Sequence, residues 1–170
     1  MHRAIFLDRD GVLNELINRN DGFYSPRKLS DFKISIDSPN FTKKTSSLGF
    51  LNIIISNQPD ISRGFLSEKR LEEMTDLLRS NLTIDDVFYC THDDSDSCSC
   101  RKPLAGLIFD AASKWDVDLS KSYFIGDSWK DIDAAKNANI NFFLLDRSYN
   151  KDYDCDSRIM SLQDIFQLIG

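Results

Sequence analysis

The chain has 170 residues, of which 41% are hydrophobic, and its 21 Lys and Arg residues stand against 27 Asp and Glu residues for a formal charge of −6. This length allows one domain with a substantial core and leaves little room for two, so the sequence predicts a single domain over residues 1–170. The acidic balance argues against a broad nucleic-acid-binding surface, and no stretch approaches the ~20 apolar residues of a membrane span.

The N-terminal segment and the cysteines indicate the compartment. Only four apolar residues, Ala4 to Leu7, precede the charged run that follows, which is too short for a secretory signal. We therefore expect a cytoplasmic protein, and a monomer. In the reducing cytoplasm its four cysteines are expected to be core residues or metal ligands rather than disulfides.

Short apolar runs alternate with helical patterns along the chain. The runs have the composition of strands buried on both faces, and they cover residues 4–7, 50–55, 87–89, 123–125 and 142–145. Helices are predicted over residues 66–82 with Ser67 as N-cap, over 102–115, over 130–139, and over 161–170 with Ser161 as N-cap. Residues 14–44 have little periodicity, so we expect a loop there, NRNDGFYSPRK, followed by a weakly marked helix. This order predicts an α/β fold with a mainly parallel sheet.

Polar clusters follow four of the predicted strands. In chain order they are Asp8 with Asp10, Ser56 to Gln58, Cys90 with His92, and Gly126 with Asp127. Each cluster alone would be explained by an ordinary helix cap or turn. Ligands of open α/β sheets bind outside the carboxyl ends of the strands, however, so the four clusters together predict one shared site.

Asp8 and Asp10 are two positions apart in extended chain, so both carboxylates can face one cavity. Their mutual repulsion calls for a cation, to which Asp127 could add an oxygen. A few protein oxygens with room left for water and phosphate suit Mg²⁺. One Asp could also attack phosphorus while the other protonates the leaving oxygen.

Such chemistry needs positive charge and hydrogen-bond donors around the phosphoryl group, and the candidates are Arg101, Lys102 and Ser56. The alternative for the two basic residues is a solvated pair at a helix start. A basic pair is electrostatically unfavourable at a helix N-terminus, so an anion bound there would explain its position.

A second metal site is predicted in the segment CTHDDSDSCSC. It contains Cys90-x-His92 and Cys98-x-Cys100, and three thiolates with one imidazole form a closed, structural zinc set. The alternative is two buried cysteines with an incidental histidine. Because Cys100 adjoins Arg101 and Lys102, a metal here would hold both cations in place.

Four ordered motifs of the chain resemble those of the haloacid dehalogenase-like (HAD) phosphatases. They are FLDRDGVLN, IIISNQ, CRKP and FIGDSWKD. SNQPDISRG and the Cys/His segment are similar to the branch that contains D-glycero-D-manno-heptose 1,7-bisphosphate phosphatase and the histidinol-phosphate phosphatases. The resemblance covers about residues 4–147 and implies a Rossmann-like, HAD-type sheet without a cap domain, with a zinc-binding loop.

The resemblance also implies roles for individual residues. Asp8 would be the nucleophile, Asp10 the general acid and base, and Lys102 the charge-neutralising lysine. Mg²⁺ would be held by Asp8, the Asp10 carbonyl and Asp127, with Asp131 supporting them. The implied phosphate ligands are Ser56 and Asn57.

This chain differs from the family pattern at positions that border the substrate. Heptose-type members tend to carry a basic residue after the Gly-Asp of the fourth motif, where this chain has Ser128, and a longer segment than the five residues between His92 and Cys98.

The function expected from all these features is an Mg²⁺-dependent phosphatase of a small phosphorylated metabolite, most simply a sugar bisphosphate, with Arg101 binding the phosphate that is not cleaved. Histidinol phosphate is the nearest alternative substrate. A polynucleotide 3′-phosphate is disfavoured by the acidic charge, and a non-catalytic binding module by retention of the full catalytic set.

Overall fold

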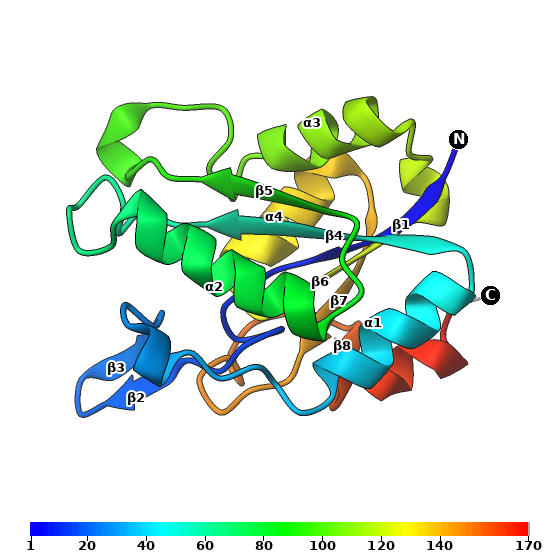
Figure 1. Cartoon of the computed structure of the whole chain (residues 1–170). Coiled ribbons are helices and arrows are strands. Elements are labelled where there is room, and N and C mark those ends of the chain that lie inside the picture. Colours follow the sequence, from blue (N-terminus) through cyan, green and yellow to red (C-terminus); the bar gives the residue numbers. More distant parts are fainter. Residues whose placement is uncertain (170) are drawn as a thin grey trace.

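The computed structural model describes residues 1–169, and a six-stranded sheet of order β5-β4-β1-β6-β7-β8 lies at its centre (Figure 1). Every pairing within this sheet is parallel, which confirms the predicted sheet. Its strands are β1 (Arg3–Leu7), β4 (Phe50–Asn57), β5 (Asp86–Cys90), β6 (Tyr123–Gly126), β7 (Asn141–Leu145) and β8 (Arg158–Ile159). The short β8 was not predicted, because two residues carry no periodicity.

Helices cover both faces of the sheet, which explains why the central strand β1 is apolar on both sides. One face packs against α1 (Ser38–Ser47), α2 (Glu68–Asn81) and the 3-10 helix η4 (Leu162–Gln167). The other face packs against α3 (Gly106–Trp115) and α4 (Trp129–Ala138). Three further single-turn 3-10 helices are η1 (Leu29–Asp31), η2 (Asp94–Asp96) and η3 (Leu119–Lys121).

Three of the predicted helices are present as α2, α3 and α4, and the predicted C-terminal helix differs in type. The hydroxyl of Ser67 accepts a hydrogen bond from the backbone N–H of Arg70 at 3.2 Å, so the predicted cap of α2 is confirmed. The C-terminal helix is instead the short 3-10 helix η4, and residue 170, the end of the predicted range, lies outside the described residues. Helix α3 begins at Gly106, four residues later than predicted.

Helix α1 was weakly marked in the sequence because its buried face is largely polar. Thr42 and Thr45 are both fully buried on it, beside Phe41. The Thr45 hydroxyl donates to the side-chain oxygen of Asn52 on β4 at 2.6 Å, and the Asn52 amide donates to the carbonyl of Thr42 at 2.8 Å. Hydrogen bonds thus replace part of the apolar contact that a helical pattern would have revealed.

Residues 18–28 were expected to form a loop, but part of this segment is a β-hairpin. Strands β2 (Ile17–Arg19) and β3 (Gly22–Tyr24) pair antiparallel. The arrowheads of β4 and β5 point toward the side of the molecule on which this hairpin lies (Figure 1). The segment between β1 and α1 thus carries a hairpin in place of a cap domain. None of the helices within residues 1–169 is both long and apolar enough to cross a bilayer.

Candidate active site and metal centre

A cavity of about 590 Å³ lies at the carboxyl ends of the central strands, where the sequence predicted one shared site. All the predicted residues of the carboxylate and phosphate site line it: Asp8, Asp10, Ser56, Asn57, Arg101, Lys102 and Asp127. The hairpin contributes Gly22 and Phe23 to its wall, and the loop after β7 contributes Tyr149.

Asp8 follows β1 directly and is held through one of its two oxygens. Its Oδ1 accepts a hydrogen bond from the backbone N–H of Arg9 at 2.8 Å and lies 2.9 Å from the Lys102 ammonium. Burial raises the pKa of Asp8 to about 6, against the opposing effect of Lys102. Burial therefore disfavours the ionised form of Asp8 in the free protein.

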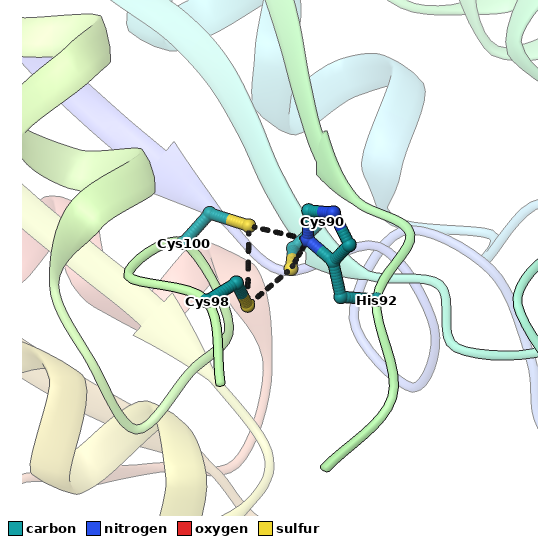
Figure 2. Close-up of side chains that lie close together, drawn as sticks. All are labelled: Cys90, His92, Cys98 and Cys100. Atoms are coloured by element: carbon teal, nitrogen blue, oxygen red, sulfur yellow. Dashed lines mark hydrogen bonds between the residues drawn. The ribbon is translucent and has the colours of Figure 1, made fainter. Parts of the chain in front are cut away.

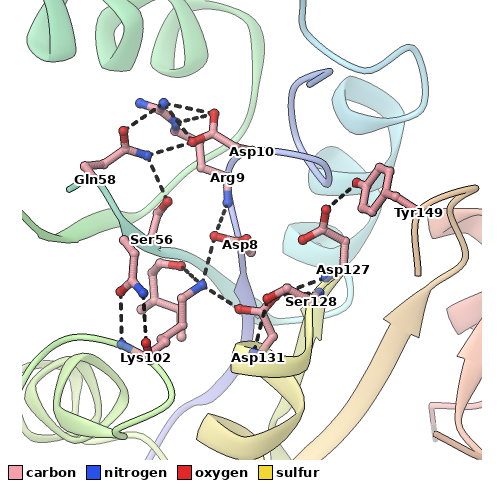
Figure 3. A network of polar contacts seen from close by, with 12 residues as sticks. Asp8, Arg9, Asp10, Ser56, Gln58, Lys102, Asp127, Ser128, Asp131 and Tyr149 are labelled. Carbon is pink, nitrogen blue, oxygen red and sulfur yellow. Dashed lines mark hydrogen bonds and ion pairs between the residues drawn. The ribbon is translucent and has the colours of Figure 1, made fainter. Parts of the chain in front are cut away.

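Lys102 is a buried cation that lies between two carboxylates, Asp8 and Asp131 (Figure 3). Its Nζ lies 2.9 Å from Asp8 and 2.6 Å from Asp131, and donates to the carbonyl of Ile55 at 3.3 Å. Although burial opposes it, these two carboxylates raise the pKa of Lys102 above its ordinary value. Lys102 is therefore a permanent positive charge at this position.

Asn57 holds the main chain of Lys102 in place. Its side-chain amide donates to the Lys102 carbonyl, and its side-chain oxygen accepts from the Lys102 N–H, each at 3.0 Å. Asn57 was predicted as a phosphate ligand, and the structure reveals this additional role at the edge of the cavity. The hydroxyl of Ser56 accepts from the amide of Gln58 at 3.0 Å.

Asp10 is enclosed by three polar side chains, two of which the sequence reasoning missed. The fully buried Arg9 donates to both Asp10 oxygens, at 2.9 and 3.0 Å, Asn14 donates to Oδ1 at 2.9 Å, and Gln58 donates to Oδ2 at 2.8 Å. Although burial opposes it, Arg9 lowers the pKa of Asp10. Arg9 lies between the two aspartates in the sequence. A charged residue inside an otherwise buried motif could have indicated that it pairs with one of them.

Three carboxylates could hold a cation beside Lys102. Asp8, Asp127 and Asp131 each offer an oxygen, and these oxygens all lie within 4.8 Å of one another. Burial and the charge of Asp8 raise the pKa of Asp127 well above its ordinary value, while Tyr149 donates a hydrogen bond to its Oδ2. Mg²⁺ prefers oxygen ligands, and carboxylates in particular. These three residues therefore fit this ion.

Gly11 lets the loop after β1 pass close to Asp127. Its φ is +89°, and a Cβ at this position would lie 1.9 Å from Oδ2 of Asp127. Any side chain here would displace the carboxylate.

The predicted zinc ligands converge on one point (Figure 2). Cys90 Sγ lies 3.6 Å from His92 Nδ1 and 3.6 Å from Cys98 Sγ, while Cys100 Sγ lies 3.3 Å from the imidazole and 3.6 Å from Cys98. Tetrahedral zinc with bonds of about 2.0–2.3 Å needs ligand atoms roughly 3.3–3.8 Å apart. Burial and the neighbouring thiols raise the pKa of Cys100, so a cation would be needed to ionise all three cysteines. The geometry is thus compatible with zinc. Cys155 is not part of this group.

Arg101 lies between the Cys/His cluster and the cavity and is itself mostly buried. Its Nε donates to Asp94 Oδ1 at 2.6 Å, and its Nη1 donates to the carbonyl of His92 at 3.3 Å. The Cys/His loop therefore sets the position of this guanidinium.

Comparison with known proteins gives one consistent result. Residues 99–159 match a family model described as HAD-hydrolase-like. D-glycero-beta-D-manno-heptose-1,7-bisphosphate 7-phosphatase of Helicobacter pylori is 35% identical over 85% of this chain and 83% of its own length. The corresponding alpha-type enzyme of Photorhabdus laumondii is 34% identical over 94% of this chain and 91% of its own.

A crystal structure of D,D-heptose 1,7-bisphosphate phosphatase from B. bronchiseptica, complexed with magnesium and phosphate, has the same fold. It superposes with a TM-score of 0.84 at 24% sequence identity, covering 98% of this chain and 99% of that one.

Proposed function

The chain belongs to the HAD-like phosphatase family that includes the D-glycero-D-manno-heptose-1,7-bisphosphate 7-phosphatases, and we propose that it is an Mg²⁺-dependent phosphatase of a sugar bisphosphate of this type. It would remove one phosphate as inorganic phosphate and release a sugar monophosphate. The observation that carries this proposal is the buried Lys102 ammonium beside Asp8, in the same cavity as Ser56 and Asp127. A nucleophilic carboxylate, a fixed cation and a set of cation ligands are the parts that phosphoryl transfer requires.

Asp8 is assigned as the nucleophile. Its Oδ1 is engaged by Lys102 and by the backbone N–H of Arg9, so we assign Oδ2 to the attack on phosphorus. The new Oδ2–P bond forms as the bond from phosphorus to the sugar oxygen breaks. The product of this step is an aspartyl-phosphate on Asp8 and the sugar alcohol.

Asp10 is assigned to the proton transfers. In the first step its carboxylic acid would protonate the leaving sugar oxygen, and in the second its carboxylate would take a proton from the water that attacks the aspartyl-phosphate. Arg9, Asn14 and Gln58 favour the carboxylate, which suits the second step. A substrate phosphate dianion nearby would favour the protonated form needed for the first.

Lys102, Ser56 and Asn57 are assigned to the phosphoryl group. The lysine neutralises charge on its oxygens, and the serine hydroxyl and the asparagine amide are hydrogen-bond donors. Asp8, the Asp10 carbonyl and Asp127 would hold Mg²⁺, with Asp131 fixing Lys102 and the N–H of Asp127. When bound, this ion supplies charge stabilisation for the phosphoryl oxygens. The magnesium and phosphate in the B. bronchiseptica structure support this assignment.

Zinc is proposed as a structural ion in the Cys/His cluster. Its ligands Cys90, His92, Cys98 and Cys100 would form a closed set with no position left for substrate. Its effect on the reaction would be indirect, through the position of Arg101. We further propose that residues 1–170 form a single domain and act as a cytoplasmic monomer without nucleic-acid partners.

The test is release of inorganic phosphate from D-glycero-D-manno-heptose 1,7-bisphosphate by purified protein. We expect turnover with Mg²⁺, reversible loss with EDTA, and a kcat/KM well above that for p-nitrophenyl phosphate. No hydrolysis of any phosphate ester would contradict the enzyme class. Equal kcat/KM for the two esters would contradict the substrate.

A further inference from the structure

Three basic side chains line the catalytic cavity in addition to Lys102. They are Arg63 from the loop after β4, Arg101 from the end of the Cys/His loop, and Lys130 from the first turn of α4. Each has a carboxylate partner in the same short segment, residues 93–94. Asp93 and Asp94 are therefore paired with cations that line the catalytic cavity.

The pairing is uneven. Asp93 is held most closely by Arg63, whose Nε and Nη2 each donate to one of its two oxygens at 2.7 Å. Asp94 is shared, because its Oδ1 lies 2.6 Å from Arg101 Nε and 3.9 Å from Lys130 Nζ. Asp93 Oδ1 also lies 4.0 Å from Arg101 Nη2, so three cations share two carboxylates, and Asp94 is the one that pairs with Lys130.

Two observations indicate that this carboxylate can be displaced. The side chain of Asp94 is 73% exposed, whereas that of Arg101 is 9% exposed, so the carboxylate lies in solvent while the guanidinium is enclosed by the protein. Asp94 Oδ1 is 3.9 Å from Lys130 Nζ but 2.6 Å from Arg101 Nε, so it compensates the charge of Lys130 less closely than that of Arg101. A doubly charged anion would compensate both cations better.

Ser128 explains why Lys130 is the relevant residue of this helix. Its hydroxyl donates to Asp131 Oδ2 at 2.7 Å and caps α4, so it serves the helix and the carboxylate that fixes Lys102. Lys130, two positions later, is the basic side chain that this helix presents to the cavity.

The sequence already assigns Arg101 to the phosphate that is not cleaved. We infer that Lys130 binds this phosphate together with Arg101, and that Asp94 occupies the position in the free protein and leaves it when a bisphosphate binds. The inference rests on the proposed bisphosphatase function and adds a device for selectivity. A substrate whose far end is neutral cannot displace Asp94 from the two cations. A phosphate dianion can, so the carboxylate disfavours monophosphates.

The test compares Lys130→Ala and Asp94→Asn with wild type, on heptose 1,7-bisphosphate and on p-nitrophenyl phosphate. Lys136→Ala is the matched control, because Lys136 lies on the same helix, is 71% exposed and pairs only with Asp133 among the described ion pairs. We expect Lys130→Ala to lower the ratio of the two kcat/KM values about tenfold and Lys136→Ala to preserve it. Asp94→Asn should lower KM for the bisphosphate severalfold without a matching change for the reporter.

The Asp94 variant separates this inference from a structural role of the loop. If Asp94 only braced Arg101, its loss would raise KM for the bisphosphate, and that result would overturn the inference. Equal effects of Lys130→Ala on both esters would also overturn it. Zinc content, measured on each variant, should equal that of wild type. If the wild type itself shows no preference for the bisphosphate, the proposed substrate fails first and the inference fails with it.

Discussion

The carboxylate site and the Cys/His cluster lie at the same end of the sheet but are built in opposite ways. Asp8 and Asp127 are 119 residues apart in the sequence and meet only because β1 and β6 are neighbours. The four ligands of the Cys/His cluster all lie within residues 90–100. The first site depends on the whole fold, whereas the second depends on one strand end and one loop. Perturbing each should therefore have different consequences for stability and for activity.

The largest expected effect is on activity alone. Asp8→Asn removes the attacking oxygen while preserving shape, so turnover of any phosphate ester should fall by at least about three orders of magnitude. The circular dichroism spectrum and the zinc content should stay at wild-type values. Activity within tenfold of wild type would remove the covalent mechanism.

The next effect combines stability with activity. Lys102→Met leaves Asp8 and Asp131 buried without their cation, and removing one partner of a buried ion pair costs about 3–5 kcal/mol. Urea unfolding in EDTA should show this loss, and phosphate release should be abolished. Lys114→Met is the control, since Lys114 is 58% exposed in its pair with Asp86 and should change stability by less than about 1 kcal/mol. A small effect at Lys102 would contradict a stabilising role of this buried ion pair.

The Cys/His cluster should respond more locally. Cys98→Ser removes one ligand, so we expect the variant to lose zinc, to keep its sheet, and to lose about ten- to a hundredfold in kcat/KM because Arg101 is no longer held. Cys155→Ser, outside the cluster, should retain zinc and activity. Elemental analysis and phosphate release are the measurements. A wild-type protein purified without zinc, and indifferent to added zinc, would contradict the structural ion.

The smallest effect concerns pH and Mg²⁺. A carboxyl group whose pKa is higher in the folded than in the unfolded chain adds stability at low pH and loses that contribution as pH rises through the folded value, about 6 for Asp8. The raised pKa of Asp127 acts in the same direction. In EDTA this contribution should therefore fall between about pH 4 and pH 7. Added Mg²⁺ should raise the Tm more at pH 7.5 than at pH 5, by roughly 3–6 °C. An Mg²⁺ effect that shrinks with rising pH would argue against carboxylate ligands.

Local sequence patterns were sufficient to predict much of the secondary structure and several of the site residues. The five strands with apolar runs, the cap of α2 and the four cysteine and histidine positions were predictable because burial, capping and ligand spacing are properties of neighbouring residues. The convergence of three of the four polar clusters also followed, because parallel strands end at one edge of a sheet. The prediction of one shared site was wrong for Cys90 and His92, which belong to the separate Cys/His cluster.

Tertiary structure alone decided which side chains complete the site. Gln58 and Asn14 enclose Asp10, and Tyr149 reaches Asp127 from the loop after β7. The polar face of α1 was hidden for the same reason, since its hydrogen-bond partner Asn52 belongs to another element. The periodicity of apolar residues indicates which residues are buried. It carries no information about which distant polar group a buried side chain contacts. The sequence determined the sheet and the chemistry of its edge, and packing of the chain determined the partners that tune each charge.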